Sequence, residues 1–269
     1  MNLEKDLLPQ VIETARKAGE FIRIESEKFT IDKAEYKGLN DLVSYVDKES
    51  EKLIVKDLTK LLPEAGYLTE EGTVAQESNE FTWVIDPLDG TTNFIHGIPI
   101  YAVCIALMKG KNPIIAVVYE VNRDECFSAS LGGGASLNGS KIHVSKASIL
   151  KESLVATGFP IFNFNNLKAY LRILDQLVQS CHGLRRMGSA AVDLCYVACG
   201  RADAFFEYNL NPWDVAAGTL IVQEAGGTVT DFRGQDDFIF GRELIAGGPV
   251  QKELQEVIVA NWIEPSCKV

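Results

Sequence analysis

The chain has 269 residues, of which 46% are hydrophobic and 23% are charged, and its formal net charge is −11. This composition predicts an ordinary globular protein with one large domain or two closely packed halves. The acidic balance argues against a nucleic-acid-binding surface, which needs a basic patch. It also repels anionic substrates, so a protein of this charge that acts on phosphates needs local positive charge, such as bound divalent cations.

The sequence contains no segment with the length and apolar character of a membrane span, and residues 1–6 lack the pattern of a signal peptide. We therefore expect a cytoplasmic protein that does not contact membranes. Six cysteines are scattered through apolar segments without the close pairing of a zinc site. Cys195 and Cys199 are four residues apart in an expected helix, where filling of the core is favoured over a metal or redox pair.

The first part of the chain combines helices with a sheet. Apolar periodicity predicts helices over residues 3–27 and 47–62, with a loop at 37–41 between them. We expect strands at residues 66–68, 83–86, 101–108, 113–121 and 124–130. Their short connections predict a largely antiparallel sheet. The glycine-rich segment 131–139 lacks the spacing of a dinucleotide-binding loop and is predicted to form a tight hairpin.

The second part again mixes helices and strands, and we place the division between an N-terminal half, 1–145, and a C-terminal half, 146–269. The two halves are expected to share an extensive interface near residue 145. This half begins with the segment 154–160, which leads into a helix that ends at about residue 179. Further helices are expected at 189–199, 212–225 and 250–259. Strands are expected at 202–207, 228–230 and 244–246.

The most informative motif runs from Trp83 to Phe94 and reads WVIDPLDGTTNF. Its first residues predict a buried strand that stops at a turn, with Asp86 and Asp89 at the carboxyl end of that strand. Pro87 and Gly90 restrict the turn so that the two carboxylates are held close together. Such a pair can bind metal, although Asp and Gly are also common in turns that have no function.

The residues after this turn favour a bound anion. Thr91, Thr92 and Asn93 can each cap a helix, where unpaired backbone N–H groups favour phosphate.

A second acidic motif, Pro212-Trp213-Asp214-Val215-Ala216-Ala217-Gly218, predicts the start of a buried helix with Asp214 in its first turn. Gly226-Gly227 supplies its end. Asp214 has a purely structural explanation, since an acid there complements the helix dipole by about 0.3–1 kcal/mol. Upstream, Glu70-Glu71 follows a short strand, and a solvated charge pair explains that motif by itself.

Glu70, Asp86, Asp89 and Asp214, with a backbone carbonyl such as that of Leu88, form an all-oxygen ligand set that suits Mg²⁺ and disfavours zinc. Four crowded carboxylates repel one another, and two divalent cations would neutralise them. With a phosphate between them, such metals polarise P–O bonds, activate water and stabilise the leaving alkoxide. The predicted chemistry is metal-assisted hydrolysis of a phosphomonoester.

These motifs, in this order, resemble those of the inositol monophosphatase family. The resemblance covers nearly the whole chain, including Gly188-Ser189-Ala190-Ala191 and the segment around Glu207, and both long motifs are highly specific. It implies an α+β fold, the layered αβαβα sandwich of lithium-sensitive, Mg²⁺-dependent sugar phosphatases. It also implies a homodimer and two or three Mg²⁺ ions.

The resemblance assigns roles to individual residues. The metal ligands it implies are Glu70, Asp86, Asp89, Asp214 and the carbonyl of Leu88. Gly90 and Thr91 hold phosphate through backbone N–H groups, while the Thr91 hydroxyl, paired with Asp47, and Glu70 position the attacking water. Lys37 lies in the layer of residues around the metal ligands and influences the site through its charge. Asp47 has an equally good structural explanation as a helix N-cap, and Lys37 as a solvated side chain.

On the substrate side, the resemblance implies that Gly188, Ser189, Ala190 and Glu207 contact the alcohol portion. Structural explanations are a helix cap for Ser189, packing for Ala190 and a strand-end charge for Glu207. Arg186, with Arg185 before it, can reach a second phosphate or form ion pairs at a subunit interface. Residues 208–211 lie where the family varies with substrate.

The leading hypothesis is an enzyme that hydrolyses inositol 1-phosphate with Mg²⁺. Fructose 1,6-bisphosphate or a nucleotide 3'-phosphate are the alternative substrates. A hypothesis of another class is a regulatory binding partner. An inactive family member is expected to have lost one of the four acids or Thr91, and none is missing here.

Overall fold

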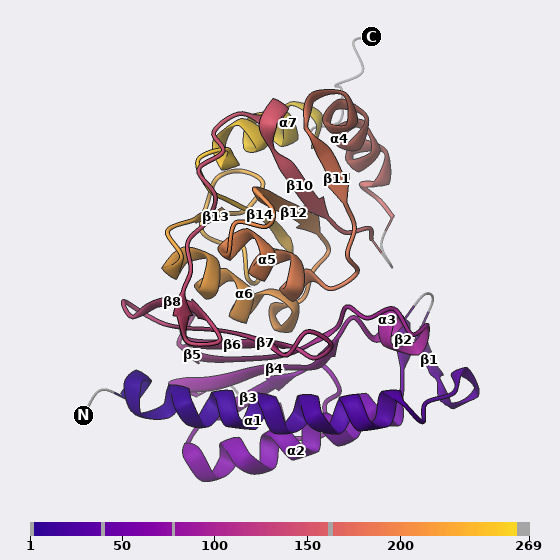
Figure 1. The fold of residues 1–269 in the computed structure, drawn as a ribbon, viewed down its shortest axis with the longest axis vertical. Coiled ribbons are helices and arrows are strands. Elements are labelled where there is room, and N and C mark those ends of the chain that lie inside the picture. The colour runs from indigo at the N-terminus through magenta and orange to yellow at the C-terminus, as the bar shows by residue number, and fades with distance from the viewer. Residues whose placement is uncertain (1–2, 39–40, 77–78, 161–163, 263–269) are drawn as a thin grey trace.

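The computed structural model describes residues 3–38, 41–76, 79–160 and 164–262. Its helices and sheets form five stacked layers, which Figure 1 shows from two helices at the bottom to two helices at the top. The sheets lie between the helical layers, so the expected layered α+β sandwich is confirmed. None of the described helices has the length and apolar character needed to cross a membrane.

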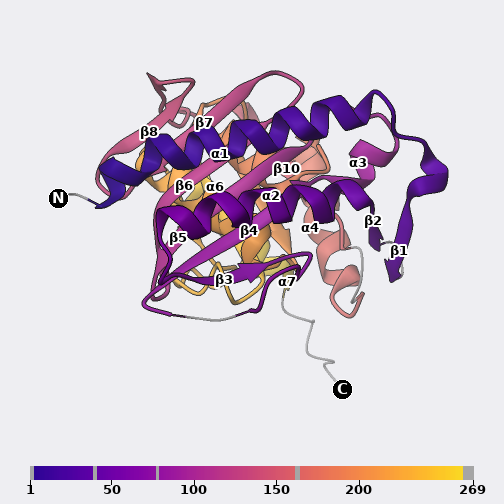
Figure 2. The same cartoon turned by 90° about the horizontal axis from the view of Figure 1, so that it is seen from below.

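The first layer consists of α1 (Leu3–Ser26) and α2 (Tyr45–Leu61), which run across the outer face of the larger sheet (Figure 2). Both were expected from apolar periodicity, and the predicted apolar positions of α1 are buried. Ser44 is the N-cap of α2, and Asp47 is the third helical residue in a capping box. The explanation of Asp47 as the N-cap was therefore wrong by three residues.

Among the described residues, seven strands form the larger sheet, hereafter the large sheet, in their order along the chain. They are β3 (Gly66–Thr69), β4 (Phe81–Asp89), β5 (Ala102–Lys109), β6 (Asn112–Glu120), β7 (Glu125–Ser130), β8 (Gly134–Leu137) and β9 (Ser140–Lys141). The sheet is antiparallel except for the parallel β3–β4 pair. The segment 131–139 was predicted to be one hairpin, but it contains two turns, with β8 between them.

The predicted end of β4 was also wrong. The strand continues through Pro87 to Asp89, and its pairing with β5 shifts register between Asp86 and Asp89. Asp86 lies opposite Cys104 and Asp89 opposite Ala102, so β4 carries one extra residue there. Such a bulge tolerates a proline and redirects the side chains next to it.

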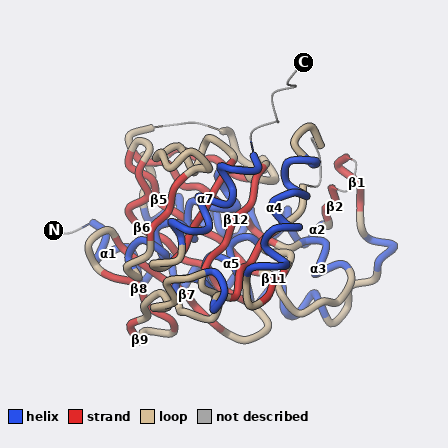
Figure 3. Tube along the Cα trace, turned by 90° about the horizontal axis from the view of Figure 1, so that it is seen from above, coloured by secondary structure: helices blue, strands red, loops and turns tan. Residues whose placement is uncertain are grey.

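The smaller sheet, hereafter the small sheet, comes from residues after 150. In the described chain its spatial order is β11 (Gly183–Arg185), β10 (Leu154–Thr157), β12 (Ala204–Tyr208), β14 (Glu243–Gly247) and β13 (Thr228–Thr230). The helices α4 (Leu167–Ser180) and α7 (Gln251–Trp262) lie against each other over its outer face (Figure 3).

Three short strands were not predicted. No strand was expected at β11, and β1 (Glu35–Gly38) pairs with β2 (Asp41–Val43) where a loop was expected. Residues 39–40 of that expected loop lie outside the described residues.

Between the sheets lie α5 (Ala190–Ala198) and α6 (Pro212–Glu224), and this middle layer forms the centre of the molecule. Every residue of α5 is buried, as are residues 215–222 of α6, which confirms the predicted buried helix. One apolar cluster runs from the large sheet through both helices to the small sheet. The buried thiols Cys104 and Cys195 belong to it. The division at residue 145 stays a prediction.

Candidate active site

The carboxyl end of β4 places two acids at the junction of the two sheets. A carboxylate oxygen of Asp86, which is buried, accepts the N–H of Leu88 at 2.9 Å. One oxygen of Asp89 accepts the Ser189 hydroxyl at 2.6 Å and the N–H of Ala191 at 2.8 Å. Asp89 therefore joins β4 to the start of α5, 100 residues later in the chain.

The turn after β4 depends on Gly90. This residue has φ of +97° and is the N-cap of the short helix α3 (Thr91–Ile95), so capping by Thr91, Thr92 or Asn93 was a wrong prediction. A Cβ at Gly90 would lie 3.0 Å from the carbonyl oxygen of Ile100 and 3.3 Å from that of Gly188. Only glycine combines this backbone conformation with such a close approach.

The hydroxyl of Thr91 lies 2.8 Å from a carboxylate oxygen of Asp47 and 3.0 Å from the carbonyl oxygen of Leu88. The other Asp47 oxygen accepts the N–H of Ser44 at 2.8 Å and its hydroxyl at 2.6 Å. Burial raises the pKa of Asp47, and hydrogen bonds from Ser44 and Thr91 oppose that rise. Asp47 thus closes the capping box and also orients the Thr91 hydroxyl.

Asp214 is the third residue of α6, where one of its carboxylate oxygens accepts the N–H of Asn211 at 2.7 Å. Removal from bulk water raises the pKa of Asp214 to about 8, and the charge of Asp89 adds to the effect. The helix start therefore delivers a carboxylate to the same region as the end of β4.

Glu70 follows β3, and its backbone N–H donates to the carbonyl oxygen of Ile85 at 3.2 Å. The buried carboxylate of Glu51 accepts the N–H groups of Glu71 at 2.8 Å and Thr73 at 2.7 Å. These bonds fix the loop beside the end of β4. Glu70 is half-buried, and it lies close enough to the aspartates for its charge to add to the effect of burial on the pKa of Asp86.

The acids predicted to bind metal line one cavity of about 310 Å³. Most of the predicted site residues line it, namely Glu70, Asp86, Leu88, Asp89, Gly90, Thr91, Arg186, Gly188, Ser189, Ala190, Glu207 and Asp214. Asp47 lies behind Thr91, outside the lining. The strand β1 contains Lys37, whose side chain lies outside the part of the chain that the structure describes.

The acids of this cavity destabilise one another's charged forms. Burial raises the pKa of Asp86 well above its ordinary value, and the charges of Glu70, Asp89 and Asp214 raise it further. Burial also raises the pKa of Asp89 to about 6, against hydrogen bonds from Ser189 and residues 190–191. A group of carboxylates that is costly to ionise together becomes favourable when cations neutralise it.

The donor set fits Mg²⁺, because carboxylates and a backbone carbonyl are hard oxygen ligands. Within the described residues, however, no three Asp, Glu, His or Cys side chains already form a cage around one point. The carboxylates share a cavity, and rotation of their side chains is needed to direct them to a common ion. The predicted ligands are thus brought together as a group, and their metal-binding role stays a prediction.

The other end of the cavity is formed by the start of α5 and the end of β12. Ser189 is the N-cap of α5, with its hydroxyl oxygen 3.3 Å from the N–H of Val192. Glu207 comes from β12, and Arg186 lies with its guanidinium carbon 5.9 Å from the centre of the Phe159 ring. Arg185 does not line the cavity and donates to the carbonyl oxygen of Leu184 instead.

Sequence reasoning missed several lining residues, namely Gly158, Phe159, Pro160, Asp193 and Trp213. Among them, only Asp193 is recognisable in the sequence, because it is the single charged residue inside an otherwise apolar helix. Phe159 and Pro160 are not recognisable, because a loop contributes them after β10.

Comparison with known proteins supports one family. The model of the inositol monophosphatase family matches residues 4–263. The chain is 44% identical to Nus factor SuhB of Escherichia coli K12 over 245 residues, which cover 90% of this chain and 91% of that protein. The crystal structure of extragenic suppressor protein suhB from Bartonella henselae has a TM-score of 0.89 at 38% identity, covering 94% of this chain and 98% of that one. The Thermotoga maritima IMPase has a TM-score of 0.87 at 32% identity, covering 95% and 97%. The chain therefore belongs to the inositol monophosphatase family.

Proposed function

We propose that this protein is a Mg²⁺-dependent phosphomonoesterase whose preferred substrate is inositol 1-phosphate. The observation that carries the proposal is the convergence of Glu70, Asp86, Asp89 and Asp214 on one cavity from three distant segments. The family relationship supports the same chemistry.

The mechanism assigns each group a task. Mg²⁺ held by the four acids and the Leu88 carbonyl would supply Lewis acidity to the phosphoryl oxygens, would lower the pKa of a water molecule and would stabilise the leaving alkoxide. Thr91 and Asp47 hold the attacking water through the Thr91 hydroxyl, whose proton is already directed to acceptors in the structure. Glu70, which lines the same cavity, accepts a proton as that water attacks phosphorus. Backbone N–H groups of Gly90 and Thr91 orient the phosphate.

The alcohol portion of the substrate occupies the other end of the cavity. Glu207 accepts hydrogen bonds from its hydroxyls, and Ser189 and Ala190 line the wall beside it. Among the described residues that line the cavity, Arg186 is the one cation, so a second phosphate would have a single partner. This favours a monophosphate over fructose 1,6-bisphosphate.

A substrate panel tests the proposal. Phosphate release is measured with inositol 1-phosphate, fructose 1,6-bisphosphate and a nucleotide 3'-phosphate, each with Mg²⁺ and with EDTA. We expect the highest kcat/KM for inositol 1-phosphate, and no turnover in EDTA. The variant Asp89→Asn should lose turnover on every substrate. Absence of metal-dependent turnover with all three compounds would refute the proposal.

The relatives named Nus factor SuhB favour a second candidate function, a non-catalytic role as a binding partner. Expression of this protein in an E. coli strain that lacks SuhB tests it. If the role is separate from hydrolysis, the unmodified protein and Asp89→Asn should both restore the function of the missing protein. Failure of both, or of Asp89→Asn alone, argues against a separate role.

The family resemblance adds two further expectations, namely a homodimer and inhibition by lithium, and the sequence itself adds a cytoplasmic location. The first is tested by light scattering of the purified protein, for which we expect twice the mass of 29.6 kDa. A monomeric mass at micromolar concentration would contradict it.

A further inference from the structure

Asp193 is a buried carboxylate in the wall of the cavity that the assigned chemistry does not use. It lies in α5, where every other residue is uncharged, and it is only 1% exposed. It lines the same cavity as the predicted metal ligands. Burial raises the pKa of Asp193, and the nearby charge of Asp89 raises it further, whereas Arg186 opposes the rise.

One oxygen of the Asp193 carboxylate lacks a structural partner. Its Oδ1 atom is buried and accepts no hydrogen bond from the described residues. Asp47 and Asp214, the acids in the first turns of α2 and α6, each accept a backbone N–H of the residue that caps their helix. Asp193 cannot do so, because Ser189 already caps α5 and Asp193 is the fourth residue of the helix. Its position is thus not explained by helix capping.

A buried acceptor without a donor costs free energy, so its retention calls for a ligand that supplies the donor. The electrostatic effects between Asp193 and its charged neighbours indicate the end of the cavity at which Asp193 lies. Burial raises the pKa of Glu207 and the charge of Asp193 raises it further, while Arg186 opposes the rise of the pKa in both acids. The Glu207 carboxylate is packed so closely against Gly158 that a Cβ there would lie 2.0 Å from it. Two acceptors therefore lie together on the alcohol side of the cavity.

We propose that Asp193 accepts hydrogen bonds from hydroxyl groups of the substrate alcohol and, with Glu207, makes the site selective for polyhydroxylated monophosphates. This inference rests on the proposed function. Rotation about the Cβ–Cγ bond is a soft motion that presents either carboxylate oxygen to the cavity. An ester whose alcohol has no free hydroxyl leaves both acids unpaired, and a site of this kind rejects such analogues.

The experiment compares Asp193→Ala and Asp193→Asn with the unmodified protein on two substrates. Inositol 1-phosphate carries hydroxyls beside the phosphate, and p-nitrophenyl phosphate carries none. For Asp193→Ala we expect kcat/KM on inositol 1-phosphate to fall about 10- to 100-fold, mainly through KM, because a substrate hydroxyl is left without its hydrogen-bond acceptor in a buried site. Turnover of p-nitrophenyl phosphate should change less than about twofold. Asp193→Asn keeps an acceptor oxygen and should lose less.

Tyr196→Phe is the matched control, because the Tyr196 hydroxyl lies on the same helix and is also buried without a partner, yet Tyr196 does not line the cavity. It should leave both substrates unaffected. The rise in melting temperature produced by Mg²⁺ should be the same in all variants, since Asp193 is not a proposed ligand.

Equal losses on both substrates, or no loss in Asp193→Ala, would overturn the role of Asp193 while the proposed function stands. If the unmodified protein hydrolyses neither ester with Mg²⁺, the proposed function fails and this inference fails with it. Should Asp193→Ala not fold, unchanged discrimination between the two substrates in Asp193→Asn and Asp193→Ser would likewise refute it.

Discussion

At the level of single residues, the hydroxyl of Thr91 joins the second helix to the turn that ends β4. Its oxygen lies 2.8 Å from a carboxylate oxygen of Asp47, and the capping box of α2 holds the Asp47 side chain in place. A fixed acceptor and a fixed hydroxyl are what the positioning of a water molecule requires.

Replacement of Thr91 by valine removes this hydroxyl while keeping the shape of the side chain. We expect kcat to fall about 100- to 1,000-fold, within the range of general acid–base contributions. Thr91→Ser retains the hydroxyl and should keep most of the activity. Steady-state kinetics on inositol 1-phosphate decide, and full activity in Thr91→Val would exclude a role for the hydroxyl.

Asp214 shows how function at this site opposes stability. Burial raises the pKa of Asp214 to about 8 and the charge of Asp89 adds to that rise, so its ionisation without cations lowers the stability of the folded protein. Asp214→Asn should raise the melting temperature of the metal-free protein and abolish the further rise caused by Mg²⁺. Thermal unfolding with EDTA and with Mg²⁺ measures both effects.

Asp231→Asn provides the control for this experiment. Asp231 accepts the N–H groups of Arg233 and Gln235 in a turn away from the cavity, so this variant should keep its response to Mg²⁺. An unchanged Mg²⁺ response in Asp214→Asn would show that Asp214 does not bind the ion.

Residues that combine a functional side chain with a backbone constraint could be predicted from the sequence. Asp86, Asp89 and Gly90 are of this kind, because Pro87 and Gly90 mark the turn in which the acids occur. Asp193 could not be assigned in this way, since a single acid in an apolar helix does not reveal whether it faces a cavity, a partner or solvent.

At the level of elements, the bulge in β4 and the turn at Gly90 direct the acids into the cavity. Gly90 has φ of +97° and close backbone neighbours, whereas Gly97, in the turn after α3, has φ of +69° and open space around a Cβ. The two glycines therefore separate the conformational cost of a side chain from the steric cost.

Gly97→Ala should cost about 1 kcal/mol in the free energy of unfolding, the penalty for a left-handed conformation. Gly90→Ala should cost clearly more, because its Cβ also meets the carbonyl oxygens of Ile100 and Gly188. Urea unfolding of both variants measures the difference. Equal losses would mean that the close approach at Gly90 can relax.

Long, regularly patterned elements could be predicted from the sequence, and short ones could not. α1 and α6 have clear apolar patterns, so both were found. β11 is only three residues long and ends in an arginine, and its strand conformation is set by pairing with β10. The end of β4 was misjudged because pairing with β5 accommodates Pro87 in a bulge.

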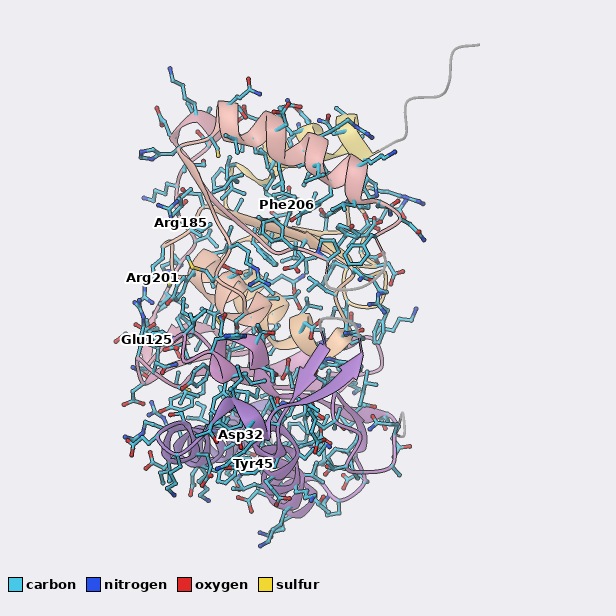
Figure 4. All side chains as sticks on the ribbon, turned by 90° about the vertical axis from the view of Figure 1, so that its right-hand side faces the viewer. Asp32, Tyr45, Glu125, Arg185, Arg201 and Phe206 are labelled. Carbon is cyan, nitrogen blue, oxygen red and sulfur yellow. The ribbon has the colours of Figure 1, made fainter. Side chains whose placement is uncertain are left out.

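At the level of the whole molecule, the two sheets share a core through α5 and α6. An ion pair reinforces this connection at the edge. Arg201, which follows α5, contacts Glu125 of β7 through two hydrogen bonds of 2.6 Å, and Figure 4 shows the two residues next to each other. The layered fold itself was predicted from the family resemblance, since local patterns do not specify how distant layers stack.

The shared core predicts that the two sheets unfold together. Trp83 reports on the large sheet, while Trp262 packs in the cluster around the small sheet. Urea unfolding is followed by fluorescence and by circular dichroism in Trp83→Phe and in Trp262→Phe. After the stability difference between the variants, measured by circular dichroism, is subtracted, the two fluorescence midpoints should be the same. Separate midpoints would show that the halves are independent domains.

The central claim is that Glu70, Asp86, Asp89 and Asp214 jointly hold divalent cations beside a phosphate. The most direct measurement is a crystal structure of the protein soaked with Mn²⁺ and inorganic phosphate, with the ions located by anomalous scattering. We expect peaks within about 2.0–2.3 Å of carboxylate oxygens from all three segments, with phosphate oxygens completing the coordination. Ions bound elsewhere, or a cavity without an anomalous peak at saturating Mn²⁺, would contradict the account.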